Sequence, residues 1–351
     1  MPDVFSHPWL GGLFGDAELE SLLSAETVLN NMLAVEAAYT RALGNVGQAE
    51  PQAVDAVLAS LAAFSPDLPK LAKGTLNDGV VLPSLVKEIR KTISEEHHSA
   101  LHKGMTSQDV IDTALVLTLK PIFALMRSRL DEAVHAIDQL ITEYGENALM
   151  GRTRMQAALT ISVKDRMNSW KRPLLQNQSR LEQLKPSILC IQLGGAVGDR
   201  KAFGLDGDEI AAYMADKLSL SNPTNCWHTD RSTIAEFASW LSLTTGALGK
   251  IGQDVTLMSQ QGISEIQLAG GGGSSAMPHK QNPVQAELLE TLARFNATQL
   301  SGIHQALVHE QERSGAAWML EWMILPQMIV ATGKALSVVQ TTLTGVDSLG
   351  H

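Results

Sequence analysis

The chain has 351 residues, of which 44% are hydrophobic and 18% are charged. This composition is typical of a folded globular protein with a large core, and it excludes a disordered chain. The net charge of −10 gives no general attraction to nucleic acid or to an anionic membrane surface. A site for an anion would therefore have to be locally basic.

The cysteine content and the N-terminus indicate a cytoplasmic protein. Cys190 and Cys226 are the only cysteines, too few for a disulfide framework or a cysteine-based metal site. The first residues lack the basic and apolar regions of a signal peptide, and no run of about 18 apolar residues predicts a membrane span. We expect a reduced compartment and no membrane partner.

Helical periodicity dominates the chain. In order, we expect helices over 16–47, 50–64, 82–99, 107–147, 157–188, 229–262, 283–310 and 316–348. The helix from Ser107 to about Asn147 would span roughly 60 Å, interrupted at most by a kink at Pro121. Strand signals are nearly absent. The predicted fold is all-α, an elongated bundle whose long helices bury apolar stripes against copies of themselves in an oligomer.

The segment GGGGSSAMPHKQNP, residues 270–283, combines glycines, hydroxyl groups and a cation. It is not a nucleotide-binding loop, because no Gly-Lys-Ser/Thr follows and no βαβ unit surrounds it. Asn282 and Pro283 predict the N-cap and first residue of the next helix, and Lys280 adds positive charge beside that helix terminus. These features favour a closing, anion-binding loop, with a helix-capping linker as the alternative.

Two other breaks between helices are polar. HKGMTSQD, residues 102–109, predicts a helix N-cap at Thr106 or Ser107 whose spare N–H groups can bind a carboxylate. GRTRMQ, residues 151–156, is rich in hydrogen-bonding side chains. His98 and His102 lie one helical turn apart but lack a third ligand, so we predict no metal site.

The glycine-rich segment resembles the GSSxMPxKxN signature of the fumarase/aspartase superfamily, from Gly273 to Asn282. The resemblance implies a homotetramer with a core of long helices, and active sites to which three subunits contribute. It also implies a small polycarboxylate substrate, with no cofactor. Ser274 would be the proton-transferring catalytic residue. Lys280 would be the second catalytic residue, stabilising the serine alkoxide together with the helix N-terminus.

The resemblance extends to the substrate-binding residues. The first polar break resembles the superfamily's H-x-G-x-T-S-x-D segment, and the second lies where many member lyases read GRTHxQ. Arg154 replaces that histidine and would bind a substrate carboxylate bidentately. The complete set of substrate-binding candidates is His102, Thr106, Ser107, Thr153, Arg154, Gln156, Ser275, Met277, His279 and Asn282.

One branch of the superfamily fits best. The purine lyases' Arg-His-Asp motif is missing as well, whereas HPWLGGLFGD and the segment 309–326 resemble the 3-carboxy-cis,cis-muconate cycloisomerases. The implied reaction is lactonisation of 3-carboxy-cis,cis-muconate in the protocatechuate branch of the β-ketoadipate pathway. The alternatives are a 3-sulfomuconate cycloisomerase, an adenylosuccinate-type lyase that releases fumarate, and a structural protein of the same fold.

The likeness also predicts the domain organisation. We expect an N-terminal helical domain over 1–105 and a central long-helix domain over 106–351. Family members carry a third, small helical domain after the central bundle, which we expect this sequence to lack.

Overall fold

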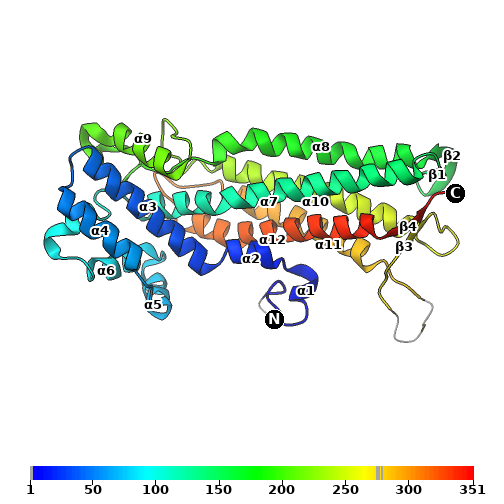
Figure 1. Cartoon of the computed structure of the whole chain (residues 1–351), viewed down its shortest axis with the longest axis horizontal. Helices are drawn as coiled ribbons and strands as arrows, with labels where there is room; N and C mark the ends of the chain where they lie inside the picture. Colours follow the sequence, from blue (N-terminus) through cyan, green and yellow to red (C-terminus); the bar gives the residue numbers. More distant parts are fainter. Residues whose placement is uncertain (1–2, 274–276, 278–279) are drawn as a thin grey trace.

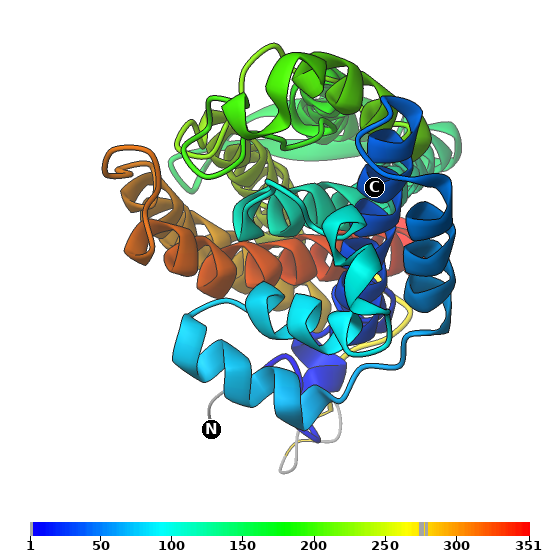
Figure 2. The same cartoon turned by 90° about the vertical axis from the view of Figure 1, so that its left-hand side faces the viewer.

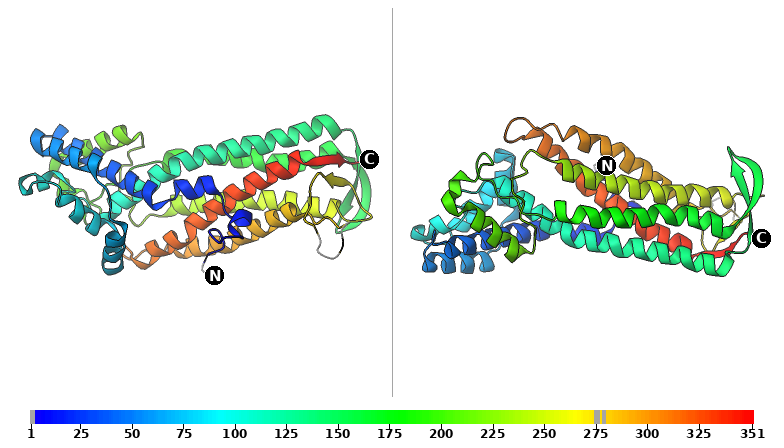
Figure 3. Two further views of the ribbon diagram at one scale, coloured as in Figure 1. Left: turned by 60° about the horizontal axis from the view of Figure 1, so that its bottom comes forward. Right: turned by 90° about the horizontal axis from the view of Figure 1, so that it is seen from above.

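The computed structural model describes residues 3–273, 277 and 280–351 of the chain. Five long helices lie side by side along an elongated molecule (Figures 1 and 3). They are α7 (Ser107–Tyr144), α8 (Val163–Ile188), α10 (Ser232–Met258), α11 (Val284–Gln305) and α12 (Ala316–Thr344). The predicted all-α, elongated long-helix bundle is confirmed.

The remaining helices are shorter. They are α1 (Gly11–Phe14), α2 (Ala17–Leu22), α3 (Ala25–Asn45), α4 (Pro51–Ala63), α5 (Leu68–Asp78), α6 (Leu82–Arg90), the 3₁₀ helices η1 (Glu95–Ala100) and η2 (Lys201–Asp206), and α9 (Gly207–Leu218). Helices α3 to α6 and α9 gather at one end of the bundle, which faces the viewer in Figure 2.

The interior has two hydrophobic clusters. The larger one runs along the five long helices, and the smaller one joins α3 to α6 with α9 and the first turns of α7. Helix α12 is long and apolar enough to cross a membrane, but 67% of its apolar window is buried inside the protein, as in a core helix. The domain boundary at residue 105 stays a prediction.

Helix α7 forms because its apolar residues repeat at helical spacing. Leu119, Ile122, Met126 and Leu130 are fully buried along one stripe. The helix begins at Ser107 as predicted, ends three residues before Asn147, and continues through Pro121. Its 38 residues separate the two ends of the bundle by roughly 57 Å.

The prediction that a helix starts at residue 157 is wrong. Strands β1 (Ala148–Thr153) and β2 (Gln156–Ser162) form an antiparallel hairpin, and α8 begins only at Val163. The hairpin turns at Arg154 and Met155, whose positive φ values of 50° and 65° are those of a tight two-residue turn. Ser162 and Asp165 then cap α8 reciprocally.

Other predicted boundaries also move. The helix predicted over 16–47 is divided at Ser24, which caps α3, and that predicted over 82–99 ends at Arg90. Three α-helices, α1, α5 and α9, were not predicted. The last helix ends at Thr344, because β4 (Val346–Leu349) pairs with β3 (Ile266–Leu268).

The predicted cap of α11 is displaced by one residue. Asn282 does not cap the helix; its backbone pairs with Gly272 in an antiparallel bridge that closes the base of the glycine-rich loop. Pro283 therefore takes the N-cap position, and the helix begins at Val284.

Candidate active site

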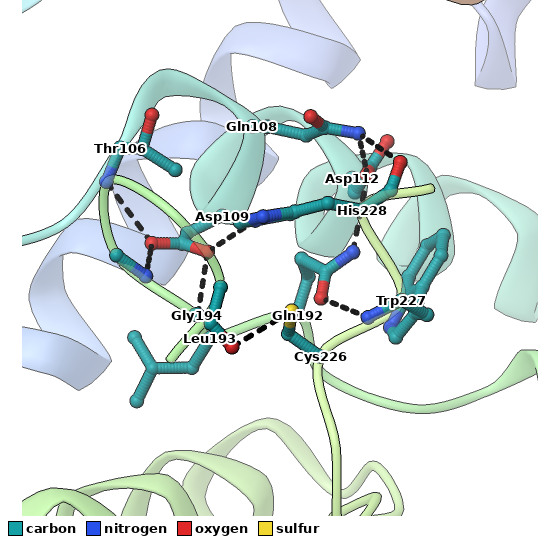
Figure 4. A network of polar contacts seen from close by, with 12 residues as sticks. Thr106, Gln108, Asp109, Asp112, Gln192, Leu193, Gly194, Cys226, Trp227 and His228 are labelled. Carbon is teal, nitrogen blue, oxygen red and sulfur yellow. Dashed lines mark hydrogen bonds and ion pairs between the residues drawn. The ribbon is translucent and has the colours of Figure 1, made fainter. Parts of the chain in front are cut away.

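A buried carboxylate organises the N-terminus of α7. Asp109 accepts hydrogen bonds from the backbone N–H groups of Thr106 (3.0 Å), Gly194 (2.8 Å) and Gly195 (2.9 Å). Its Oδ1 also lies 2.8 Å from Nε2 of His228 (Figure 4). Asp109 is fully buried, so these four partners are what make its charge tolerable there.

His228 is charged at neutral pH. Burial lowers its pKa, but the contacts with Asp109 and Cys226 outweigh burial and raise the pKa to about 9. The side chain is 2% exposed, so the imidazolium and Asp109 form an ion pair shielded from water. This pair fixes the 194–195 loop against α7.

This shift makes stability depend on pH. Because the folded-state pKa lies above the unfolded value near 6.5, the stabilisation is complete below pH 6.5 and is lost as the pH rises through 9. In a Cys226→Ser background, which removes the neighbouring thiol and its share of the pKa shift, the free energy of unfolding should fall by about 2 kcal/mol between pH 6.5 and 9.5. Urea titrations at the two pH values measure it. Adding His228→Gln to this background should abolish the loss of stability, whereas adding His135→Gln, which changes an exposed histidine, should retain it. If the free energy of unfolding fell equally with pH in both double variants, the loss would not be due to His228.

A second ion-pair cluster lies beside the first. The guanidinium of Arg231 contacts Asp112 at 2.7 and 3.1 Å and Glu321 at 2.6 and 2.9 Å. Trp318 donates its indole N–H to Asp112 (3.2 Å), and the Arg231 guanidinium lies 4.8 Å from the Trp227 ring centre. All three charged side chains are at least 98% buried. The cluster ties α7, the start of α10 and α12 together.

A guanidinium group from the loop before α12 lies at the N-terminus of α7. Arg313 donates to the hydroxyl of Thr106 (2.6 Å) and to the carbonyl of Ala196 (2.8 Å). Thr106 is the N-cap residue, as predicted, and Ser107 follows it half-buried. Helix N–H groups, two hydroxyls and a guanidinium at one place can bind a carboxylate.

His102 lies just before this terminus and is held in place by a buried acid. Its Nδ1 is 2.7 Å from Oε1 of Glu36, and its backbone is left-handed with φ of 55°. Glu36 is fully buried, whereas the His102 side chain is 16% exposed. The glutamate thus orients a histidine whose ring remains accessible.

The second group of candidates lies on the β1–β2 hairpin. Thr153 and Gln156 are paired across the last rung, and both are exposed, as is Arg154 in the turn. Arg154 also lines a cavity of about 470 Å³ with Arg152, Arg166 and Lys250. Glu265 and Asp254 on the same wall leave a net positive charge.

The third group lies on the glycine-rich loop. Its base is closed by the Gly272–Asn282 bridge and borders a cavity of about 390 Å³. Met277 and Lys280 are exposed. Ser274, Ser275 and His279 lie outside the described residues, so their predicted roles stay predictions.

Within one chain these groups do not form a single site. The hairpin and the loop lie at the same end of the bundle, where Arg152 contacts Glu265 (2.7 Å) just before β3. His102, Thr106 and Ser107 lie at the opposite end, roughly 57 Å of helix away (Figure 1). Among the described residues, no cluster of three or more His, Cys, Asp or Glu side chains could hold a metal ion.

Comparisons with known proteins agree with this architecture. A family model described as Lyase matches residues 17–295. The chain is 34% identical over 346 residues, 97% of its length, to a 3-carboxy-cis,cis-muconate cycloisomerase of Bradyrhizobium diazoefficiens, and covers 77% of that protein. The chain belongs to the Lyase family of the fumarase/aspartase superfamily.

Two further matches show which kinds of enzyme the chain resembles. The crystal structure of the 3-carboxy-cis,cis-muconate lactonizing enzyme from Pseudomonas putida superposes with a TM-score of 0.91, at 32% identity, over 97% of this chain and 77% of that one. An N-acetyl-S-(2-succino)cysteine lyase from Enterococcus italicus is 28% identical over 95% of this chain and 74% of its own length. The family therefore includes both cycloisomerases and lyases.

Sequence reasoning did not anticipate the two buried ion-pair clusters. No sequence pattern singles out His228 or Arg231, and Arg313 is covered only by the resemblance of the segment 309–326. For Arg313, the available signal was the run of charged residues from Glu310 to Arg313 directly before an apolar helix.

Proposed function

We propose that the protein is a cycloisomerase that converts 3-carboxy-cis,cis-muconate to a carboxymuconolactone. The observation that carries this proposal is similarity over 97% of the chain to a protein named for that reaction. Arg154, in the position where many lyases of the superfamily have histidine, fits a substrate that carries an additional carboxylate.

The reaction requires charge stabilisation and one proton. A substrate carboxylate oxygen adds to a carbon–carbon double bond, and the electron pair moves onto a neighbouring carboxylate as an enolate-like form. Ser274 then delivers a proton to the adjacent carbon. A serine hydroxyl is a weak acid and a weaker base, so Lys280 would stabilise its alkoxide.

The substrate carboxylates need separate anchors. Arg154, with Thr153 and Gln156, would hold one, and the α7 terminus with Thr106 and Ser107 would hold another. Since these anchors lie at opposite ends of one chain, the proposed active site forms between protomers of a homotetramer. The long helices would supply the tetramer core, with each site drawing on three chains.

Mixing two inactive variants tests this shared site. Ser274→Ala alters the glycine-rich loop and Thr106→Val alters the α7 terminus. In a heterotetramer, some active sites therefore combine an intact loop from one chain with an intact α7 terminus from another. Co-refolding equal amounts should restore roughly a tenth to a quarter of wild-type activity, whereas each variant alone stays inactive. Failure to regain activity in mass-verified heterotetramers would contradict a site shared between chains.

Replacing Arg154 should affect substrate binding more than turnover. Arg154→Gln removes a charge-assisted contact of about 1.5–3 kcal/mol, so KM should rise about 10- to 100-fold while kcat changes by less than about threefold. The exposed Arg172→Gln on α8 serves as the matched control. Steady-state kinetics measure both constants, and an unchanged KM would remove Arg154 from the site.

A second candidate function is a lyase that releases fumarate, which the similarity to the succinocysteine lyase favours. A substrate panel separates the candidates: 3-carboxy- and 3-sulfo-cis,cis-muconate, adenylosuccinate and argininosuccinate. We expect the highest kcat/KM with the carboxymuconate. A higher value with the sulfonate would reassign the substrate, fumarate release would establish a lyase, and no turnover of any substrate would favour a structural role.

A further inference from the structure

Cys226 lies on the wall of an open cavity that the proposed reaction does not use. The cavity has a volume of about 380 Å³ and is lined by residues from three segments, including Gly198, Arg200, Gly207 and Asn225. Cys226 is half-buried, and its Sγ lies 3.2 Å from the carbonyl oxygen of Gly198. The thiol is thus accessible from the cavity while its other side faces the protein.

The glycine at position 198 keeps the sulfur uncovered. Its φ is 82°, and a Cβ placed there would lie 2.6 Å from Sγ of Cys226 and 3.6 Å from Nδ1 of His228. Any other residue would therefore press on the sulfur and contact the ring nitrogen beside it. The sulfur and this ring nitrogen therefore both lie within 4 Å of one point beside Gly198.

One ring nitrogen of His228, the imidazole next to the thiol, is not engaged by Asp109. Nε2 of His228 is bound to Asp109 at 2.8 Å, whereas Nδ1 is buried and makes no hydrogen bond of good geometry within the described part of the chain. His228 is 98% buried, and Cys226 is the titratable group next to that nitrogen. Asp109 binds one nitrogen of the imidazole and Cys226 lies near the other, which is the order that activates a nucleophile.

The electrostatics of the two cysteines differ. Burial raises the pKa of the Cys226 thiol, but the contacts with His228 outweigh burial and bring that pKa below the ordinary value. Burial raises the pKa of Cys190 to about 11, and its Sγ faces the carbonyl of Ser187. Cys190 is therefore expected to be unreactive and can serve as an internal control for Cys226.

We propose that Cys226 is a covalent modification site, a thiolate activated by the His228–Asp109 pair that captures small, uncharged α,β-unsaturated carbonyl compounds entering the cavity. The cavity favours uncharged compounds because its cations are paired: Arg200 with Asp208 at 3.0 Å and Lys201 with Asp199 at 2.8 Å. The thiolate is a soft nucleophile that adds to the β-carbon of such acceptors.

The addition needs no other reactant. At neutral pH the pair stands as a thiolate beside the His228 imidazolium, whose Nδ1 carries the proton that the thiol has given up. Sγ forms a bond to the β-carbon, and the π electron pair of the carbon–carbon double bond moves to the α-carbon as an enolate. The α-carbon then takes the proton from Nδ1, which leaves a thioether and an imidazole that regains a proton from solvent at neutral pH.

Labelling with N-ethylmaleimide tests this proposal without any substrate, so its outcome is independent of the proposed function. Peptide mass spectrometry follows the two cysteines separately in the wild-type protein between pH 6 and 9, with N-acetylcysteine as the free thiol. We expect Cys226 to react at least 100-fold faster than Cys190 at pH 7, with a midpoint below the ordinary value near 8.5. A midpoint at or above that of the free thiol would overturn the proposal.

Substituting the histidine assigns the activation. His228→Gln should slow the labelling of Cys226 at pH 7 at least 10-fold and raise its midpoint, whereas the exposed His135→Gln should change neither. Unchanged labelling in folded His228→Gln would also overturn the proposal. If circular dichroism shows that this variant is unfolded, the wild-type pH profile decides.

Discussion

Replacing Ser274 by alanine should lower kcat for 3-carboxy-cis,cis-muconate about 10²- to 10⁴-fold, with KM changed by less than about threefold. The size follows from the loss of a positioned proton donor, because general acid–base catalysis contributes that range. The change falls mainly on kcat because the serine hydroxyl acts when the carbon is protonated rather than when the carboxylates are bound. Stopped assays at saturating substrate measure it.

The control for this change is another serine-to-alanine substitution. Ser301 is exposed on α11, the helix that follows the glycine-rich loop, and Ser301→Ala should leave kcat within about twofold of the wild type. A Ser274→Ala enzyme that keeps more than a third of wild-type kcat, with normal mass and circular dichroism, would remove Ser274 from proton transfer. Lys280 would then be the next candidate for the proton-transferring residue.

Replacing Arg231 by methionine should destabilise the protein by about 3–5 kcal/mol. The substitution leaves Asp112 and Glu321 as buried carboxylates without their shared cation, and breaking a buried ion pair on one side has a cost of that size. The loss should appear as a lower denaturant midpoint with an unchanged slope. Because the cluster adjoins the α7 terminus, substrate binding should weaken as well.

Two comparisons test the origin of that cost. Arg294 pairs with Glu290 on the surface of α11 and its side chain is 77% exposed, so Arg294→Met should change stability by less than about 0.5 kcal/mol. Combining Arg231→Met with Asp112→Asn and Glu321→Gln removes the unpaired charges and should recover part of the loss. A single-variant loss below about 1 kcal/mol, or no recovery in the triple variant, would contradict the ion-pair account.

The long helices were predictable because their signal is local. The three- and four-residue spacing from Leu119 to Leu130 can be read directly, and the cap at Thr106 depends only on residues within one turn. The β1–β2 hairpin was missed for a local reason too. Its turn places Arg154 and Met155 at positive φ, without the Asn-Gly or Asp-Gly pair that normally predicts such a turn.

The buried clusters were not predictable from pattern. Asp109 meets His228 across 119 residues of chain, and Arg231 meets Glu321 across 90. No periodicity or spacing connects such partners, because only the packing of α7, α10 and α12 brings them together. The sequence also does not reveal that the candidates at the α7 terminus lie a full length of α7 away from those on the hairpin and the glycine-rich loop (Figure 1).

The most direct test of the proposed function is to identify the product formed from 3-carboxy-cis,cis-muconate by the wild-type protein. We predict catalytic loss of the diene absorbance at 1 s⁻¹ or faster, on the order of a typical enzyme, and a single carboxymuconolactone in the proton NMR spectrum. The Ser274→Ala variant should form that product at least about 100-fold more slowly. An unchanged diene spectrum after prolonged incubation with folded wild-type protein would contradict the cycloisomerase assignment.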